Sequence, residues 1–190
     1  NVDLEYVKLQ SSDGAIYYFA DENLGYKRLE KQFKDKKQWI KGIPKLKTIA
    51  QIFKERGGYK VLGKIKGAQM IGWEYEGPFD ELESQSKLGG YPFVDDKLKA
   101  AGQTGISCHR VIDGGKDSIG SDVVVAGEGT GIVHVAPGCG AIDKQIAQKQ
   151  DLVAIAPLDE ESCYIDGFGD LSGKCATDKN TTSTVIVNLK

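Results

Sequence analysis

Residues 128–143 read E-G-T-G-I-V-H-V-A-P-G-C-G-A-I-D, and this stretch carries the strongest local signals in the chain. The apolar run Ile132–Val135 predicts a strand, and the glycine- and proline-rich turn after it opens a helix predicted over Ala141–Gln150. His134 and Asp143 would then lie around a loop of exposed backbone amides. Because such a loop can hold a small polar ligand, the stretch predicts a local fold and a binding site together.

Short strands dominate the prediction for the rest of the chain. Val2–Gln10 and Ala15–Phe19 alternate apolar and polar residues on either side of Ser-Ser-Asp-Gly, which predicts a hairpin. Further strands are predicted over 59–65, 106–112, 123–126 and 152–156, and helices over about 21–33 and 44–53, the second ended by Gly57 and Gly58. This irregular order excludes a doubly wound sheet. It favours an α+β fold with a β-barrel-like core of short strands and peripheral helices.

The composition is that of an ordinary soluble protein, with 190 residues of which 40% are apolar and 27% charged. A single domain over residues 1–190 is therefore expected. No apolar run approaches the roughly 20 residues of a membrane span, and no signal peptide precedes the first predicted strand, so a cytoplasmic location is expected. The chain begins without Met and contains only Met70, so we expect a fragment of a larger protein.

The four cysteines, at positions 108, 139, 163 and 175, form no C-x-x-C pair. Zinc sites usually contain such a pair, so no metal is expected. Reduced thiols are the default for a cytosolic protein. Cys139 lies inside the 128–143 stretch and could be a nucleophile, although no base in that stretch is dedicated to it, which favours a plain loop residue.

Charge is distributed unevenly along the chain. The segment from Lys27 to Lys66 holds 14 Lys and Arg against 3 acids, a net charge of +11, so the remainder carries −13 of the total of −2. This basic segment, with predicted helices at about 21–58, is either a phosphate-facing surface or a solvated pair of helices. Lys34, Lys36 and Lys37 are its candidate contacts to a nucleic acid.

The 128–143 stretch resembles a known family. Its order G-T-G-[IV]-V-H-x-A-P-G-x-G-x-x-D, followed by Gln148-Lys149, is similar to the signature of the editing domain, also called connective peptide 1, inserted in isoleucyl-tRNA synthetases. Residues 66–79 resemble a second, upstream run of the same domain, F-K-G-x-x-L-V-G-x-x-Y-E-P-x-F. Valyl and leucyl relatives share the G-T-G and the Asp but usually lack the His, so His134 favours the isoleucyl branch.

The resemblance implies hydrolysis of mischarged Val-tRNA(Ile), without a cofactor, at the acceptor end of the tRNA. It assigns Asp143 to the α-ammonium of the aminoacyl ester, although by position alone Asp143 could equally be an acid that stabilises a helix N-terminus. It makes His134 a steric gate against the larger cognate side chain, whereas a lone His on a strand is more often a core residue. It assigns substrate contacts to Thr130, Gly131, Ala136, Pro137 and Gly138.

Two family features are absent from the sequence. There is no threonine-rich T-T-P-W-T segment, which lines the substrate pocket in the family. There is also no H-I-G-H or K-M-S-K-S motif, so the ATP-dependent activation of an amino acid would belong to a synthetic domain outside this chain. Three alternatives stay open: an editing domain of the valyl or leucyl type, a non-catalytic RNA-binding module, and a thiol hydrolase using Cys139 and His134.

Overall fold

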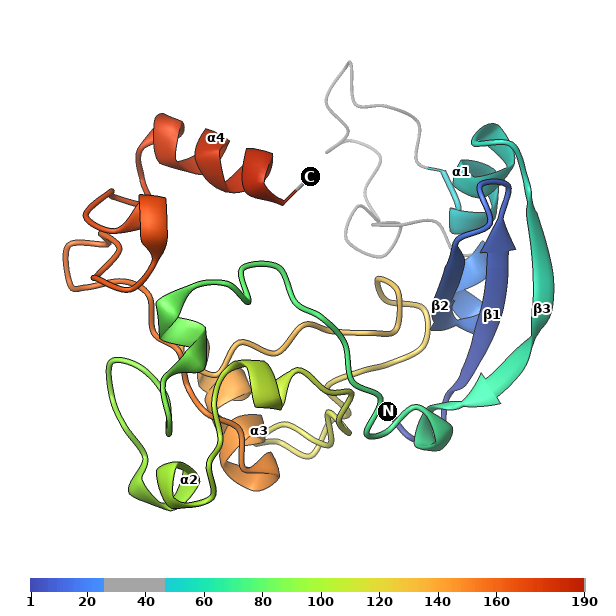
Figure 1. Cartoon of the computed structure of the whole chain (residues 1–190). Coiled ribbons are helices and arrows are strands. Elements are labelled where there is room, and N and C mark those ends of the chain that lie inside the picture. Colours follow the sequence, from blue (N-terminus) through green and yellow to red (C-terminus); the bar gives the residue numbers. More distant parts are fainter. Residues whose placement is uncertain (26–46, 190) are drawn as a thin grey trace. The chain divides into compact units, whose positions relative to one another are not determined.

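A computed structural model describes residues 1–25 and 47–189, and Figure 1 shows their helices and strands. The chain forms two compact units. Unit 1 comprises Asn1–Ile71 and Asp113–His134, and unit 2 comprises Gly72–Ile112 and Val135–Lys190. The boundary between His134 and Val135 divides the 128–143 stretch between the two units. The expectation of a single domain over residues 1–190 stays a prediction.

Unit 1 is built on a three-stranded antiparallel sheet (Figure 1). Strand β1 (Glu5–Ser11) lies between β2 (Ile16–Ala20) and β3 (Tyr59–Lys66). The β1–β2 hairpin closes through Ser11 N–H donating to the Ala15 carbonyl at 2.9 Å, with Gly14 at a φ of 90°, a value that glycine adopts without strain. The predicted hairpin and the predicted strand at 59–65 are both confirmed.

Helix α1 (Ile49–Glu55) covers one face of this sheet. Its core contacts are the buried Val7, Leu9, Phe19 and Ile49, with the half-buried Leu24, Phe53 and Tyr59 packed against them. The Thr48 hydroxyl accepts a hydrogen bond from the Gln51 N–H at 3.1 Å, and the Gln51 side chain accepts one from the Thr48 N–H at 2.9 Å. This capping box begins the helix at Ile49, and the chain leaves it at the predicted glycines.

The predicted helix over 21–33 falls largely outside the described residues. Its first part, Asp21–Gly25, is a 3-10 helix. Pro44, Lys34, Lys36 and Lys37 also lie outside the described residues, so the structure says nothing of the predicted nucleic-acid contacts.

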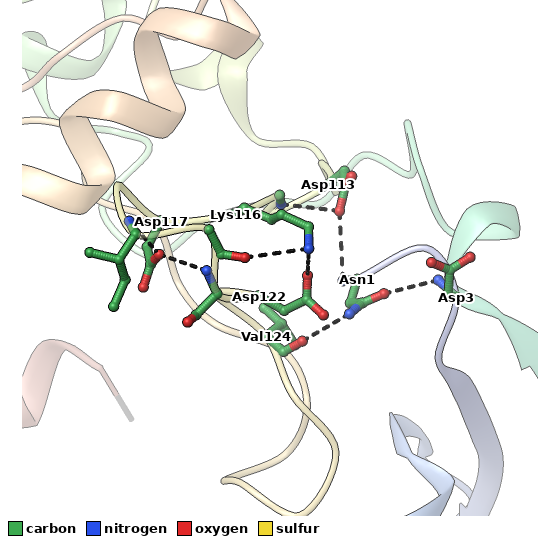
Figure 2. A network of polar contacts seen from close by, with 11 residues as sticks. Asn1, Asp3, Asp113, Lys116, Asp117, Asp122 and Val124 are labelled. Atoms are coloured by element: carbon green, nitrogen blue, oxygen red, sulfur yellow. Dashed lines mark hydrogen bonds and ion pairs between the residues drawn. The ribbon is translucent and has the colours of Figure 1, made fainter.

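Residues 113–134 form a loop with one isolated bridge, between Lys116 and Asp122, and the predicted strands over 123–126 and 132–135 are wrong. A polar network folds residues 113–124, as Figure 2 shows: Asn1 Nδ2 donates to the Val124 carbonyl at 3.1 Å, and Lys116 Nζ lies 3.7 Å from Asp122 Oδ1. Ile132 and Val133 are about half exposed. Their β-branched side chains therefore do not fill a sheet core, which is what the strand prediction assumed.

Unit 2 contains the helices α2 (Asp96–Ala100), α3 (Ala141–Gln150) and α4 (Lys179–Asn188). The prediction of α3 is confirmed at both ends. The predicted strands over 106–112 and 152–156 are wrong, because residues 106–108 form a 3-10 helix and only isolated bridges pair Glu74 with Arg110 and Tyr91 with Ile155.

Two of the four cysteines form a disulfide, Cys163–Cys175, so the expectation of reduced thiols is wrong for this pair. The pair bridges two antiparallel stretches, with Tyr164 N–H donating to the Lys174 carbonyl at 2.9 Å and Ala176 N–H to the Ser162 carbonyl at 2.8 Å. Cys108 and Cys139 are free thiols. A spacing of 12 residues gave no signal of this pairing, because the backbone geometry that brings the two cysteines together is tertiary.

The α+β class is confirmed, but the β-barrel-like core is not. The described residues contain one open sheet of three strands. Short apolar runs in 106–156 are held by turns and single bridges instead of ladders, so they add no strands to close the sheet. None of the helices in the described residues is long and apolar enough to cross a membrane.

Candidate functional site

The unit 1 part of the 128–143 stretch is fixed by side chains from distant parts of the sequence. Asn23 is fully buried, and its Nδ2 donates to the carbonyls of Glu128 at 3.0 Å and Gly129 at 3.1 Å. Its Oδ1 accepts from the Gly127 N–H at 2.7 Å. The Tyr6 hydroxyl donates to the Gly131 carbonyl at 2.8 Å. These bonds clamp the G-T-G run to the sheet.

Gly131 is needed for this close approach. It has a φ of 75°, and a Cβ there would lie 2.4 Å from the Cβ of Ala20. Ala20 also donates its N–H to the Thr130 carbonyl at 2.8 Å, so β2 and the loop run in contact. The Thr130 hydroxyl donates to the Ile132 carbonyl at 3.0 Å and is half-buried.

His134 ends unit 1 and is exposed. Within the described residues its imidazole has no hydrogen bond or ion pair, so it is not the satisfied core histidine of the alternative interpretation. An exposed, unpaired imidazole is compatible with a role toward a ligand.

The unit 2 part of the stretch is a turn followed by a helix N-terminus. Cys139 N–H donates to the Ala136 carbonyl at 2.9 Å, and Pro137 occupies the turn between them. Gly138 packs closely: a Cβ on it would lie 2.0 Å from the Ile155 carbonyl oxygen. This turn therefore holds the three predicted substrate-contact residues next to the N-terminus of α3. They are Ala136, Pro137 and Gly138.

Asp143 lies in the first turn of α3 and is half-buried. Its carboxylate folds back over the helix N-terminus, since a Cβ on Gly140 would lie 2.5 Å from Asp143 Oδ2. The first N–H groups of a helix have no partner within it, and a carboxylate beside them is stabilised by the helix dipole. The position thus fits the helix-terminal interpretation, and the same carboxylate can accept bonds from an ammonium group.

The predicted site residues are therefore divided between the units. Thr130, Gly131 and His134 lie in unit 1, and the 136–138 turn and Asp143 lie in unit 2. The residue that sequence reasoning missed is Asn23, which anchors the G-T-G run. Asn is a common residue at helix N-termini, so at the start of the helix predicted over about 21–33 its sequence position indicates a capping role and not an anchor for a distant loop.

Unit 1 also has a pocket of about 270 Å³ at the end of the sheet. It is lined by Asp3, Leu4, Glu5, Ala20, Asp21, Glu22, Lys66 and Ala126. None of the predicted site residues lines it. Lys64 lies beside this wall and donates to Asp21 Oδ2 at 2.5 Å, and this hydrogen bond raises the pKa of Lys64.

The other histidine has a packing role in unit 2. His109 Nδ1 lies 3.0 Å from Asp80 Oδ1, in a contact too bent to be a good hydrogen bond, and its ring stacks on Tyr75 at 5.2 Å. Burial and the Asp80 carboxylate raise the pKa of Tyr75. Within the described residues no cluster of His, Cys, Asp and Glu could hold a metal ion.

The sequences of known proteins that resemble this chain belong to one class of enzyme. No protein-family model matches the chain. Its relatives are isoleucine–tRNA ligases, with which it shares 24–32% identity over about 70% of its length. The chain is therefore homologous to a segment of an aminoacyl-tRNA synthetase.

Three relatives define the match. The isoleucine–tRNA ligase of Sulfolobus acidocaldarius is 30% identical over 133 residues, which cover 70% of this chain and 10% of that protein. That of Methanocaldococcus jannaschii is 32% identical over 147 residues (75% and 12%), and that of Wolbachia pipientis wMel is 32% identical over 144 residues (70% and 13%). The chain spans about a tenth of the length of these curated relatives.

Proposed function

We propose that this chain is the proofreading domain of an isoleucine–tRNA ligase and hydrolyses the ester bond of mischarged Val-tRNA(Ile). The observation that carries the proposal is the homology to isoleucine–tRNA ligases over about 70% of the chain. The G-T-G…H-x-A-P-G…D signature supports the finer assignment to proofreading. In this proposal the chain acts in the cytoplasm, contacts the acceptor end of the tRNA and the rest of its own synthetase, and needs no metal or cofactor.

Proofreading is needed because binding alone cannot separate two amino acids that differ by one methylene. One methylene in an apolar pocket discriminates by only about 1–3 kcal/mol, and the established example of this limit is isoleucyl-tRNA synthetase choosing isoleucine over valine. A second site must therefore hydrolyse the smaller, wrong product and exclude the larger, right one.

In the proposed reaction Asp143 binds the α-ammonium group of the valyl ester. A carboxylate can accept two or three charge-assisted hydrogen bonds from an ammonium ion. The first turn of α3 fixes the orientation of the Asp143 carboxylate. The side chain is only half-buried, so a ligand can still reach it.

His134 serves as the steric gate. Its exposure and its lack of a partner among the described residues leave the ring free to occupy the space that the extra methylene of isoleucine would need. No carboxylate partner within the described residues orients it, so we assign it no role as an essential general base.

The two clamped loops supply the remaining contacts. The Gly131 carbonyl accepts a hydrogen bond from the Tyr6 hydroxyl, the Thr130 carbonyl accepts one from the Ala20 N–H, and the 136–138 turn packs against Ile155. Fixed backbone groups of this kind cost little reorganisation when they meet an ester or a ribose. A bound water and a neighbouring ribose hydroxyl carry out the attack in this proposal, since the ester is already activated.

Deacylation of Val-tRNA(Ile) by the full-length ligase tests the proposal. Asp143→Ala and Asp143→Asn should let Val-tRNA(Ile) accumulate, because loss of the ammonium anchor removes about 1.5–3 kcal/mol, roughly ten- to a hundredfold in rate. Aminoacylation with isoleucine should stay near the wild-type rate. Asp151→Asn, at the other end of α3, is the matched control and should hydrolyse Val-tRNA(Ile) normally. If both Asp143 variants hydrolysed Val-tRNA(Ile) at the wild-type rate, Asp143 would only stabilise the N-terminus of α3 and would not bind the substrate.

The gate has its own test. His134→Ala should admit the isoleucyl side chain and shorten the lifetime of correctly charged Ile-tRNA(Ile), while His109→Phe should not. An unchanged Ile-tRNA(Ile) lifetime in the His134 variant would remove the gate. Hydrolysis that alkylation of Cys139 abolishes would instead support a thiol hydrolase.

The basic segment belongs to the same proposal. Charge reversal at Lys34, Lys36 and Lys37 should raise the Kd for every tRNA about equally, because phosphate contacts position a nucleic acid without reading the amino acid. Each phosphate that the variant no longer neutralises should flatten the log–log salt dependence by about 0.7–0.9. An unaltered salt slope would mean that these lysines only solvate the surface.

A further inference from the structure

The disulfide lies in a part of unit 2, between α3 and α4, that has little regular structure (Figure 1). Residues 157–176, all of them described, contain one short 3-10 helix and no α-helix or strand. Their antiparallel contacts are the single bridges between Leu158 and Tyr164 and between Cys163 and Cys175. A segment held by turns and single bridges opens more easily than a helix or a sheet, so its order depends strongly on a covalent link. We call residues 157–176 the bridged segment.

The two cysteines of the bridged segment are accessible to a reductant. Cys163 and Cys175 are half-buried, and the neighbouring Glu161 and Lys174 are exposed. Thiol–disulfide exchange requires a thiolate to approach one of the two sulfurs, so access is one of the factors that set its rate. A dissolved dithiol can therefore attack this bond, in contrast to a disulfide that is enclosed in a core.

The compartment decides what such a bond is for. In the cytosol of mesophiles glutathione and thioredoxin keep thiols reduced, and a disulfide that forms there is usually transient, with a catalytic or a redox-sensing role. Catalytic dithiols are typically C-x-x-C pairs, whereas Cys163 and Cys175 are 12 residues apart. In the cytoplasm, where the proposed function places this chain, the pair therefore fits the sensing role.

The bridged segment begins next to the candidate site. A Cβ on Gly138 would lie 2.0 Å from the Ile155 carbonyl oxygen and 2.9 Å from the Ala156 Cα, so these two residues back the predicted substrate-contact turn. Pro157 follows them directly, and its carbonyl accepts a hydrogen bond from the Ile165 N–H at 3.0 Å. Ile165 is two residues from the disulfide. The contacts between the disulfide and the turn all lie within unit 2, so loosening the bridged segment should also loosen the backing of the turn.

We propose that the Cys163–Cys175 pair is a redox switch of the candidate site: the disulfide fixes the bridged segment behind the substrate-contact turn, and reduction slows ester hydrolysis. In the switching step one thiolate of a soluble dithiol attacks a sulfur of the pair, which breaks the S–S bond and forms a mixed disulfide. The second thiolate of the reagent then displaces the remaining cysteine. Two electrons and two protons pass to the protein, and the reagent becomes a disulfide. This regulation rests on the proposed function.

The first test uses the 190-residue chain, with dithiothreitol as the dithiol. Maleimide labelling after denaturation, counted by mass spectrometry, should find two thiols in the air-oxidised chain, four after reduction, and two again after reoxidation with glutathione disulfide. Hydrogen exchange should accelerate on reduction over 157–176 and over 136–139, and stay unchanged in β1. Four thiols in the air-oxidised chain, or unchanged exchange over 136–139, would overturn the switch.

The second test measures hydrolysis of Val-tRNA(Ile) by the full-length ligase with and without dithiothreitol. The reduced enzyme should be about three- to tenfold slower, because small displacements of groups that position a substrate are costly in rate. The double variant Cys163→Ser, Cys175→Ser should be as slow as the reduced enzyme and should not respond to dithiothreitol. Cys108→Ser keeps the pair and is the matched control, which should respond as the wild type does.

The reduced wild-type enzyme carries no substitution, so it tests the switch even where the double variant does not fold. Equal rates with and without dithiothreitol in a ligase that hydrolyses Val-tRNA(Ile) would overturn the switch and leave proofreading in place. A ligase that hydrolyses no valyl ester in either redox state would instead remove the proposed function, and with it the regulation of that function by the pair.

Discussion

The two parts of the 128–143 stretch are held in different ways. The part in unit 1 is a loop without regular structure, and Asn23 and Tyr6, more than 100 residues away in the sequence, bond to its backbone. The part in unit 2 is held by its own turn, by α3 and by close packing of Gly138 on Ile155. A motif that is continuous in sequence can therefore combine a loop held by distant residues with a helix start that is folded by its own turn.

The largest effect should come from the remote anchor. Asn23→Ala removes three hydrogen bonds from a fully buried side chain and should lower the free energy of unfolding by about 4 kcal/mol, at about 1–1.5 kcal/mol for each bond. Hydrogen exchange should accelerate over 127–131 and stay unchanged in α3. Asn180→Ala, an exposed position in α4, is the control. If Asn23→Ala accelerated hydrogen exchange in α3 as much as in 127–131, the two parts of the stretch would not be independent.

The disulfide should have the next largest effect, confined to unit 2. Cys163→Ala with Cys175→Ala reopens a loop of 12 residues, and in the chain-entropy model this costs about 3 kcal/mol. Urea denaturation with and without a dithiol reductant measures the loss. The Cys108→Ala, Cys139→Ala protein keeps the bond and should still respond to reductant. A double Cys163, Cys175 variant as stable as the wild type would contradict the pairing.

A smaller loss of stability should follow from adding a side chain in the turn of the unit 2 part. Gly138→Ala would place a Cβ 2.0 Å from the Ile155 carbonyl oxygen, so backbone must move, at a cost of about 2 kcal/mol. Gly63→Ala, where a Cβ meets nothing within 4 Å, should change stability far less. Thermal melting of the two variants checks this, and equal melting temperatures would mean that the turn yields easily.

The smallest effect should come from the single hydroxyl of Tyr6. Tyr6→Phe removes the bond to the Gly131 carbonyl and should cost about 1 kcal/mol. Burial, and to a lesser extent the Asp113 carboxylate, raises the pKa of Tyr6 above its ordinary value of 10.0. The folded chain therefore holds this proton more tightly than the unfolded chain, and stability should fall as the pH rises above about 10.

The same variant provides the check on that pH dependence. Tyr6→Phe should lose the part of the alkaline destabilisation that Tyr6 causes, as measured by urea unfolding between pH 8 and about 11. An identical pH profile in the wild type and the variant would show that the Tyr6 hydroxyl titrates alike in the folded and unfolded chains.

The elements that could be predicted from sequence are those that are determined by residues close together in the chain. The hairpin, β3 and α3 carry their own turn residues, alternation and helix periodicity, and all three were found where expected. The glycines that end α1 were also found, although its start depends on a cap at Thr48 that the apolar periodicity did not indicate.

What could not be predicted depends on tertiary contacts. Apolar runs at 106–112 and 132–135 look like strands, but a strand needs a partner, and these runs bond to single residues or to side chains instead. The role of Asn23 and the pairing of Cys163 with Cys175 have the same origin. For the candidate site, sequence placed Asp143 in the first helical turn and Gly138 in the tight turn, and it could not place Thr130 and His134 in a different unit from Asp143.

The division into two units also decides how the molecule could be dissected. Each unit uses two separate stretches of chain, so no single cut releases either of them whole. Gly72 N–H donates to the Val111 carbonyl at 2.8 Å, which brings the two ends of the 72–112 segment side by side. Deleting this segment, joining Ile71 to Asp113 through a short glycine linker and ending the chain at His134 should therefore give unit 1 as one continuous polypeptide, with the sheet and the Asn23 anchor intact.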